Sequence, residues 1–214
     1  MEVVTRKRES GKLRKKQIKR ATLEIISEEG LKRLSTKNLA QHVHLSEGTI
    51  FRHFHSKEDI LLSIMDDVKK DLLDPLREIA FDTTLPQKRL KDFMCFHLDY
   101  LKKNNGVTIL LFTEAAYQNS APMLVQLNEL FRQIKHDFEK IVQDGIAAGL
   151  WSGAFALDAL SFLYLGIPIT MSIEMKLIPE FFTDHDFCPQ MLRLVYRLLG
   201  AKKNAPVSNK NGNF

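Results

Sequence analysis

Cysteine is nearly absent from this sequence, which has only Cys95 and Cys188 among its 214 residues. The two are far apart in the chain and form no C-x-x-C pair. Such a pattern supplies neither a zinc ligand set nor the paired framework of a small secreted domain. We therefore expect two reduced thiols.

Several other signals are missing. The first twenty residues, MEVVTRKRESGKLRKKQIKR, carry many charges but no apolar run, so they do not form a secretory signal, and a cytoplasmic location is expected. The chain has no strand pattern and no internal repeat. It also lacks a nucleophile elbow, a phosphate loop and a paired-carboxylate motif, so we expect no enzyme activity and no cofactor.

A long apolar run occurs once, at residues 153–173 (GAFALDALSFLYLGIPITMSI). Asp158 interrupts it, and the remainder gives about 22 Å of helix, which is too short for a bilayer core of roughly 30 Å. A soluble helix that is apolar all round needs partners on every side. We therefore expect no membrane span, and a homodimer through helices near 156–175 and 188–200.

Positive charge is concentrated near the N-terminus. The chain has a net charge of +5, and nine of its first twenty residues are Lys or Arg, whereas positive and negative charges are nearly balanced after residue 60. A basic segment on a near-neutral remainder suggests a module that binds a polyanion, for which this segment supplies an arm. A solvated charged tail is an equally acceptable interpretation of the arm.

The segment that follows divides into short helices. An apolar stripe predicts a helix over about 12–29, with Gly30 as its stop. Ser35 or Thr36 can cap a second helix, TKNLAQHV, and Ser46 can cap a third, EGTIFRHF. Ser56 can cap a long amphipathic helix that ends near residue 82. This order predicts a helix-turn-helix unit.

Four of the seven histidines lie in this unit, as the H-x-H pairs His42/His44 and His53/His55. Residues two apart on a helix point in nearly opposite directions, so neither pair can converge on one ion. No cysteine or carboxylate completes a ligand set nearby. We therefore expect no metal site here, and interpret these side chains as polar groups on and beside a recognition helix.

Residues 15–65, and especially LSEGTIFRHFHSKEDIL, resemble the DNA-binding domain of the TetR/AcrR transcriptional regulators. The resemblance implies an all-α fold of about nine helices. It divides the chain into a basic arm with a three-helix DNA-binding domain (1–56), a helical effector-binding and dimerisation domain (57–200) and a disordered tail (201–214). One departure is His44, where the family often has Gly, and this position needs a left-handed backbone.

The expected DNA contacts follow from helix positions and from the resemblance. Groups at the start of the second helix suit a phosphate, Arg52 suits guanine or phosphate, and the resemblance implies a backbone contact for Lys57. Phe51 can face the DNA or the core, whereas Ile50 and Phe54 are core residues. The full set is Thr36, Lys37, Ser46, Glu47, Gly48, Thr49, Phe51, Arg52, His53 and Lys57.

Further helices are expected at about 87–103, 107–118, 122–149, 155–175 and 188–200. His97 lies in the middle of an apolar face in LKDFMCFHLDYL, either as a core histidine with one hydrogen bond or as a polar group in an effector pocket. The candidate pocket residues are Phe93, His97, Glu114, Tyr117, Trp151 and Tyr164.

These features favour a ligand-responsive, dimeric DNA-binding repressor that binds a pseudo-palindromic operator as double-stranded DNA. A small apolar effector would release it by tilting the long helix from Lys57 to about Phe81. The competing class is a helical enzyme or adaptor whose basic terminus serves RNA or a membrane surface. A TetR-like scaffold that binds other proteins is a variant of that class.

Overall fold

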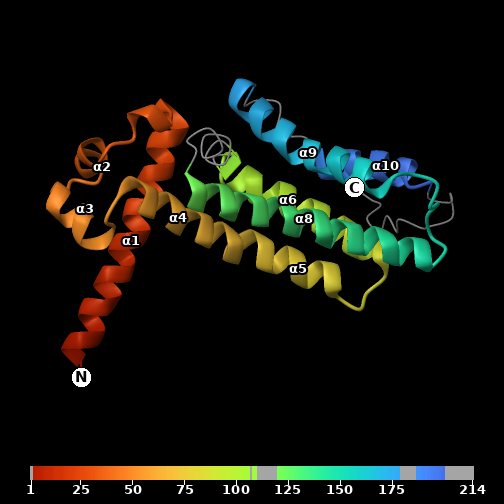
Figure 1. The fold of residues 1–214 in the computed structure, drawn as a ribbon, viewed down its shortest axis with the longest axis horizontal. Helices are drawn as coiled ribbons and strands as arrows, with labels where there is room; N and C mark the ends of the chain where they lie inside the picture. Colours follow the sequence, from red (N-terminus) through yellow and green to blue (C-terminus); the bar gives the residue numbers. More distant parts are fainter. Residues whose placement is uncertain (1, 107, 110–119, 179–186, 201–214) are drawn as a thin grey trace, which may run out of the picture.

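The computed structural model describes residues 2–106, 108–109, 120–178 and 187–200, with side chains from residue 11 onward. Within these ranges the chain forms α-helices, one 3-10 turn and one π-helical turn, and no strand occurs. The predicted all-α class is confirmed. Figure 1 shows a small helical unit at one end of the molecule and a larger set of long helices beyond it.

The small unit contains α1 (Glu2–Glu29), a 3-10 turn (Leu31–Arg33), α2 (Thr36–His42) and α3 (Glu47–His53). The Oγ atom of Ser35 caps α2 by accepting from the Asn38 amide at 3.1 Å, and Ser46 caps α3 by accepting from the Thr49 amide at 3.2 Å. These side chains satisfy amides that the first turn of a helix leaves unpaired. The predicted helix-turn-helix unit is confirmed.

The first helix is longer than predicted. We expected it to begin near residue 12, but α1 begins at Glu2 and includes Gly11, around which an added Cβ would meet no atom within 4 Å. Lys, Arg and Glu are good helix formers, so the charged segment extends the helix rather than leaving it as an irregular arm. In Figure 1 this end of α1 projects away from the other helices.

A helical rod leads from the small unit into the larger one. It consists of α4 (Lys57–Val68), a π-helical turn (Lys69–Leu73) and α5 (Asp74–Phe81), with right-handed helical backbone angles at both joints. The Ser56 cap was predicted, but the π turn was not. The turn ends at Leu73, two residues before Pro75, which has no amide hydrogen to donate. Prolines and π turns both interrupt regular helical hydrogen bonding.

The larger unit packs in layers (Figure 1). α6 (Pro86–Lys103) and α8 (Ala121–Ala147) lie against α5, and α9 (Leu157–Leu177) and α10 (Phe187–Leu198) cover their other side. α9 contacts both α6 and α8, whereas α10 contacts α6. Of the predicted helix at 107–118, only residues 108 and 109 are described, and the tail at 201–214 lies outside the described residues.

Aromatic rings from three helices form the centre of this unit. Phe138 of α8 stacks on Tyr164 of α9 with 4.2 Å between ring centroids, and Phe93 of α6 lies 5.7 Å from the same tyrosine ring. All three side chains are buried. Nearby, the guanidinium of Arg89 donates to the Ala80 carbonyl at 2.7 Å and to Asp144 at 2.9 Å. These contacts join the end of α5 to α6 and α8.

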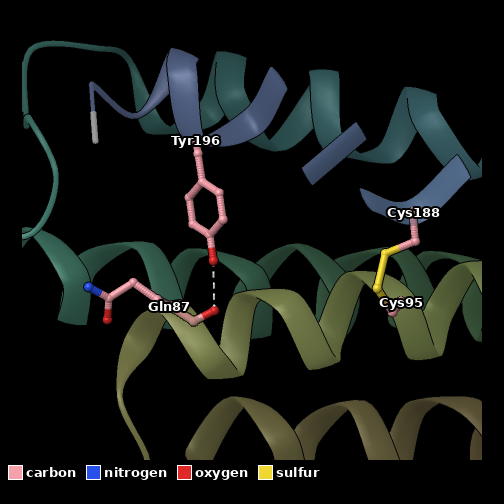
Figure 2. The surroundings of a disulfide bond; sticks show 4 residues. All are labelled: Gln87, Cys95, Cys188 and Tyr196. Carbon is pink, nitrogen blue, oxygen red and sulfur yellow. Dashed lines mark hydrogen bonds between the residues drawn. A yellow bond between two sulfur atoms is a disulfide. The ribbon is translucent and has the colours of Figure 1, made fainter. Parts of the chain in front are cut away.

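The two cysteines form a disulfide, Cys95–Cys188, which links α6 to α10 with their Cα atoms 5.4 Å apart (Figure 2). The expectation of two reduced thiols was wrong. Their large separation in sequence gave no sign of pairing, but α10 folds back along α6 and brings the second cysteine beside the first.

The backbone of α8 packs closely against the Trp151 ring at Gly145. A Cβ added at this glycine would lie 2.0 Å from the ring. Gly145→Ala must displace this buried ring, and we expect it to lower the free energy of unfolding by roughly 2 kcal/mol or more. Thermal or urea unfolding measures this. Gly11→Ala is the matched control: its Cβ meets open space, so it should leave stability unchanged or raise it by up to about 1 kcal/mol. Equal stabilities for the two variants would contradict the packing argument.

Candidate nucleic-acid interface and internal cavity

The third helix separates its polar face from its core face. Ile50 and Phe54 are buried, as predicted, whereas Glu47, Gly48 and Arg52 are exposed. Phe51 could be assigned to either side from sequence, and its side chain is 47% exposed, so it does not belong to the core. α3 therefore presents a continuous outer face of expected DNA contacts.

The starts of α2 and α3 are tied together by side chains that we predicted as DNA contacts. The Thr36 hydroxyl donates to the Glu47 carboxylate at 2.8 Å, and the Ser46 and Thr49 hydroxyls are 2.9 Å apart. Lys37 is exposed beside them. The Thr36–Glu47 bond links the starts of the two helices, whereas the Ser46–Thr49 contact lies within the first turn of α3. Two of the expected contact residues, Thr36 and Glu47, therefore also help to position the recognition helix.

The histidines take separate structural roles. His44 lies in the turn between α2 and α3 with φ of 53°, which confirms the left-handed backbone expected there. His42 bonds to Glu24 of α1 at 3.2 Å, and His55 caps the start of α4 by donating its amide to Asp59 at 3.0 Å. Among the described residues, no three His, Cys, Asp or Glu side chains gather as a metal site.

Basic side chains of α1 extend the polar face of α3. Burial lowers the pKa of His53, and the positive charges of Lys15, Arg14 and Arg52 lower it further. The Nζ atom of Lys15 also lies 5.1 Å from the Phe54 ring centroid. The sequence predicted a basic arm as a whole, but it did not identify Arg14 and Lys15 as the residues that meet the recognition helix.

Lys57 lies where the small unit joins the rod. Its Nζ atom donates to the Leu31 carbonyl at 3.3 Å, and its side chain is half-buried. The expected contact of Lys57 with the DNA backbone stays a prediction.

A small internal cavity lies among the rod, α6, α8 and α9. Its volume is about 20 Å³, which is enough for a water molecule but not for a drug-sized ligand. Apart from His97 and Thr108, the lining residues that the structure describes are apolar. The lining residues are Leu72, His97, Leu101, Thr108, Ile109, Leu130, Phe131, Ile134, Leu165, Pro168 and Ile169.

Two polar side chains mark the cavity wall. His97 is buried and its Nδ1 atom lies 2.8 Å from the Tyr164 hydroxyl, and burial lowers the pKa of this histidine to about 4. The imidazole is therefore neutral near pH 7. The Thr108 hydroxyl is buried and has no hydrogen-bond partner in the part of the chain that the structure describes. Both can bond to a polar atom on an otherwise apolar guest.

The expected pocket residues separate into groups. His97 lines the cavity. Tyr164 does not line it but lies within hydrogen-bond distance of His97, and Phe93 packs on the Tyr164 ring. Trp151 lies elsewhere, beside Gly145 and Tyr196. Glu114 and Tyr117 lie outside the described residues. Sequence reasoning missed Leu72 and Thr108, because a cavity formed by four elements has no local sequence signal.

In addition to the helical rod, hydrogen bonds connect the small unit and the rod with the larger unit. The Glu58 carboxylate of α4 accepts from Ser120, the N-cap of α8, and Lys176 near the end of α9 donates to the Ser27 carbonyl of α1. Because α9 also lines the cavity, it connects the cavity wall with the first helix of the small unit.

The outer layer exposes an apolar face. Its members lie on α9 and α10, and they are Phe162, Leu163, Ile173, Leu177, Leu194 and Leu198. We call this set the outer apolar face. By length and composition alone α9 could cross a membrane, but this single helix is weak evidence, because a core helix of a soluble protein passes the same test. Its contacts with α6 and α8 are those of a helix in a globular domain.

Comparisons with known proteins agree with this architecture. Residues 18–64 match the family model described as bacterial regulatory proteins, tetR family. The nucleoid occlusion factor SlmA of Haemophilus influenzae is 25% identical over 151 residues, which cover 67% of this chain and 69% of that protein.

Two solved structures share the fold. A bacterial regulatory protein in the tetR family from Rhodococcus RHA1 superposes with a TM-score of 0.75 at 18% identity, covering 88% of this chain and 97% of that one. FadR from Bacillus subtilis, solved in complex with stearoyl-CoA, gives 0.67 at 20% identity, covering 86% and 96%. The chain therefore carries the DNA-binding domain of the tetR family of bacterial regulatory proteins at residues 18–64, and the fold of the whole chain is that of TetR-family regulators.

Proposed function

We propose that this chain is a dimeric, ligand-responsive repressor that acts in the cytoplasm and leaves its operator when a small apolar effector binds. The observation that carries the proposal is Leu72, which belongs to the π turn of the rod and also lines the cavity. A guest in the cavity therefore touches the element that leads directly to the recognition helix. In domain terms, residues 1–56 bind DNA, and residues 57–200 bind the effector and the second copy.

On the DNA side, two copies place two α3 helices in successive major grooves of a pseudo-palindrome, about one helical turn apart or a small multiple of it. Arg52 contacts a base edge or phosphate, and Lys37 and Lys57 contact phosphates. The outer apolar face supports the dimer, because exposed apolar patches of this kind mark protein interaction sites. Four helices, two α9 and two α10, would form the contact.

On the effector side, the small size of the cavity has a direct consequence. A ligand larger than a few atoms fits only if α6, α8 and α9 move apart, so it binds the wider arrangement in preference to the one described. Turning a 99:1 equilibrium into 1:99 needs about 5.5 kcal/mol of such preference. An apolar ligand that satisfies His97 and Thr108 can supply it. FadR, a fold neighbour, was solved in complex with stearoyl-CoA, which supports an apolar effector here.

A second candidate is a DNA-bound scaffold without an effector. The match to SlmA extends over 151 residues, well beyond the 18–64 region of the family model, and SlmA is a nucleoid occlusion factor. Under this alternative the cavity stays closed and the chain binds DNA constitutively. Apolar compounds that bind the purified protein and weaken its DNA affinity would favour the repressor.

The direct test is to purify the full chain from its own cells with the DNA that it retains, and to sequence that DNA. We expect enrichment of one pseudo-palindrome, whose duplex then binds the pure protein as a dimer with strong salt dependence. Enrichment without a palindrome, or tighter binding to single-stranded RNA or anionic vesicles, would reject the proposal.

Arg52→Ala and Lys57→Ala should weaken operator binding in different ways. Loss of a base contact at Arg52 is expected to cost about 1 to 3 kcal/mol and to relax preference at one base position. Loss of a phosphate contact at Lys57 should weaken binding to all duplexes and reduce the salt slope by about one unit. Titrations over a set of single-base operator variants measure both. Equal losses on every sequence for both variants would remove Arg52 from the specificity residues.

Operator affinity should rise as the pH falls from about 7.5 to 6. In the free protein the pKa of His53 is below its usual value of 6.5, so the ring is mostly neutral at pH 7. A phosphate beside it stabilises the protonated form, so binding takes up a proton and acid favours the complex, by at most about tenfold per pH unit. His53→Gln should flatten this dependence. An identical pH profile for the two proteins would place His53 away from phosphate.

A further inference from the structure

Two contacts hold α10 on α6, and Figure 2 shows both. Near the start of α10, Cys188 is joined to Cys95 by the disulfide. Farther along the helix, the Tyr196 hydroxyl donates to the Gln87 carbonyl at 2.8 Å. The helix is thus fixed by a covalent bond at one end and by a hydrogen bond toward the other.

The two ends differ in how much other packing supports them. In the C-terminal half Val195 and Leu199 are buried, and the Leu199 carbonyl accepts from the Ser152 amide at 2.8 Å. In the first turn Pro189 and Gln190 are exposed and Cys188 is half-buried. Without the disulfide, the C-terminal half keeps its contacts while the first turn keeps few of them.

This first turn lies beside the cavity wall. Phe187 and Cys188 pack against a small cluster of Leu98, Leu101 and Met171, and Leu101 lines the cavity. On the other side of the bond, Cys95 stands two residues before the cavity residue His97 on α6. A change in the disulfide therefore alters the support of the cavity-lining residue Leu101.

We propose that Cys95 and Cys188 form a thiol–disulfide exchange site, which a dithiol reductant opens and which determines how firmly the first turn of α10 packs against Leu101 in the cavity wall. The exchange chemistry stands by itself. Its effect on operator release rests on the repressor function proposed above.

The exchange uses two electrons and two protons. A reductant thiolate attacks one cysteine sulfur, the Cys95–Cys188 bond breaks, and a mixed disulfide forms. The second thiol of the reductant then displaces the remaining cysteine, so the protein gains two thiols and the dithiol becomes a cyclic disulfide. Attack at Cys95 is favoured, because the leaving thiolate of Cys188 lies in the first turn of α10, where the helix dipole stabilises negative charge.

The expected working environment supports exchange rather than a permanent crosslink. A regulator that binds chromosomal DNA works in the cytoplasm, where thioredoxin and glutathione systems keep most thiols reduced. Disulfides found in that compartment are usually transient, and serve catalysis or redox sensing. Both cysteines here are half-buried rather than enclosed, so a small thiol can approach the pair.

The test compares three states of the purified full chain: without reductant, after equilibration with dithiothreitol, and after re-oxidation of the reduced sample. Alkylation and mass spectrometry count the thiols, and hydrogen exchange follows the amides of residues 191–193, which close the first turn of α10. Reduction should speed their exchange by about tenfold or more, while exchange at Leu199, whose amide bonds to Val195 at 2.9 Å, changes less than about twofold. Re-oxidation should restore the original rates.

Two variants serve as controls. Cys188→Ala should exchange as the reduced protein does and should not respond to dithiothreitol. Tyr196→Phe removes the other contact, so it should speed exchange at Leu199 and keep the redox response at 191–193. A pair that stays oxidised in the folded protein would overturn the proposal, as would free thiols before any reductant is added. Loss of all helical structure on reduction, or unchanged exchange at 191–193, would overturn it too.

Operator binding is measured on the same samples. Once the protein is known to bind an operator, reduction should change its affinity for an apolar effector by at least about threefold. The effector concentration that releases the operator should change by the same factor, since coupling of this size is within the usual range. A protein that exchanges thiols as described but binds no operator in either state would reject the repressor function alone. A protein that binds operator but does not exchange would reject this proposal alone.

Discussion

Phe162→Glu combined with Leu198→Glu is expected to give a folded monomer that binds its operator at least about 100-fold more weakly than the parent chain. The two side chains are 72% and 54% exposed, so glutamate at these positions stays in water and costs the monomer little. In a dimer formed by α9 and α10, the same carboxylates would be buried without partners, which costs several kcal/mol. Each monomer then binds one operator half-site and loses the gain in affinity that comes from binding both half-sites at once.

Sedimentation velocity with and without operator duplex measures the change. Val125→Glu is the matched control, since Val125 is 69% exposed but lies on α8, outside the outer apolar face. It should leave both the dimer and the operator affinity unchanged. A double-glutamate variant that remains dimeric, or a monomer that binds as tightly as the parent, would remove α9 and α10 from the dimer contact.

The DNA-binding half of the fold was predictable because its signals are local. Ser35, Ser46 and Ser56 each precede a helix by one residue and accept from an amide three residues on. Ile50 and Phe54 recur at a spacing of four, which places them on one buried face and leaves Arg52 on the other. The left-handed backbone at His44 could also be inferred, because the family that the segment resembles often has Gly at this position.

The second half of the fold depends on contacts between segments that are distant in sequence, so less of it could be predicted from the sequence. Cys95 and Cys188 are 93 residues apart, and only the path of α10 along α6 pairs them. The cavity is formed by side chains from separate helices, of which His97 alone could be inferred, from its position on an apolar face. The π turn at Lys69–Leu73 likewise has no clear signal, although Pro75 marks a place where regular bonding cannot continue.

Arg14 and Lys15 are an intermediate case. Their charge was evident, but their position beside His53 depends on the angle at which α1 crosses the recognition unit. Because α1 is a helix through this segment, its basic side chains are held in fixed directions rather than spread over a flexible arm. The positive surface beside α3 is therefore preformed, which lowers the ordering cost of contacting phosphates.

Removing the disulfide should cost the oxidised chain a large part of its stability. The bond closes a loop of 93 residues, and chain-entropy arguments assign roughly 4 to 5 kcal/mol to a loop of that length. The double variant Cys95→Ala, Cys188→Ala should therefore unfold at a temperature roughly 10 °C or more below the oxidised parent, at equal protein concentration. The parent in dithiothreitol should unfold close to the variant, which separates the loss of the bond from the change of side chains.

The same free energy governs the redox behaviour. Folding and disulfide formation form one thermodynamic cycle. The free energy by which the disulfide stabilises the folded chain therefore equals the free energy by which folding favours disulfide formation. A contribution of 4 to 5 kcal/mol means that folding favours bond formation by roughly a thousandfold over the unfolded chain. The reduced protein should therefore close the pair again when an oxidised dithiol, such as oxidised dithiothreitol, accepts the two electrons. If the oxidised parent and the double variant unfold at the same temperature, the fold does not favour the pair, and neither the stability argument nor the preference for closure would hold.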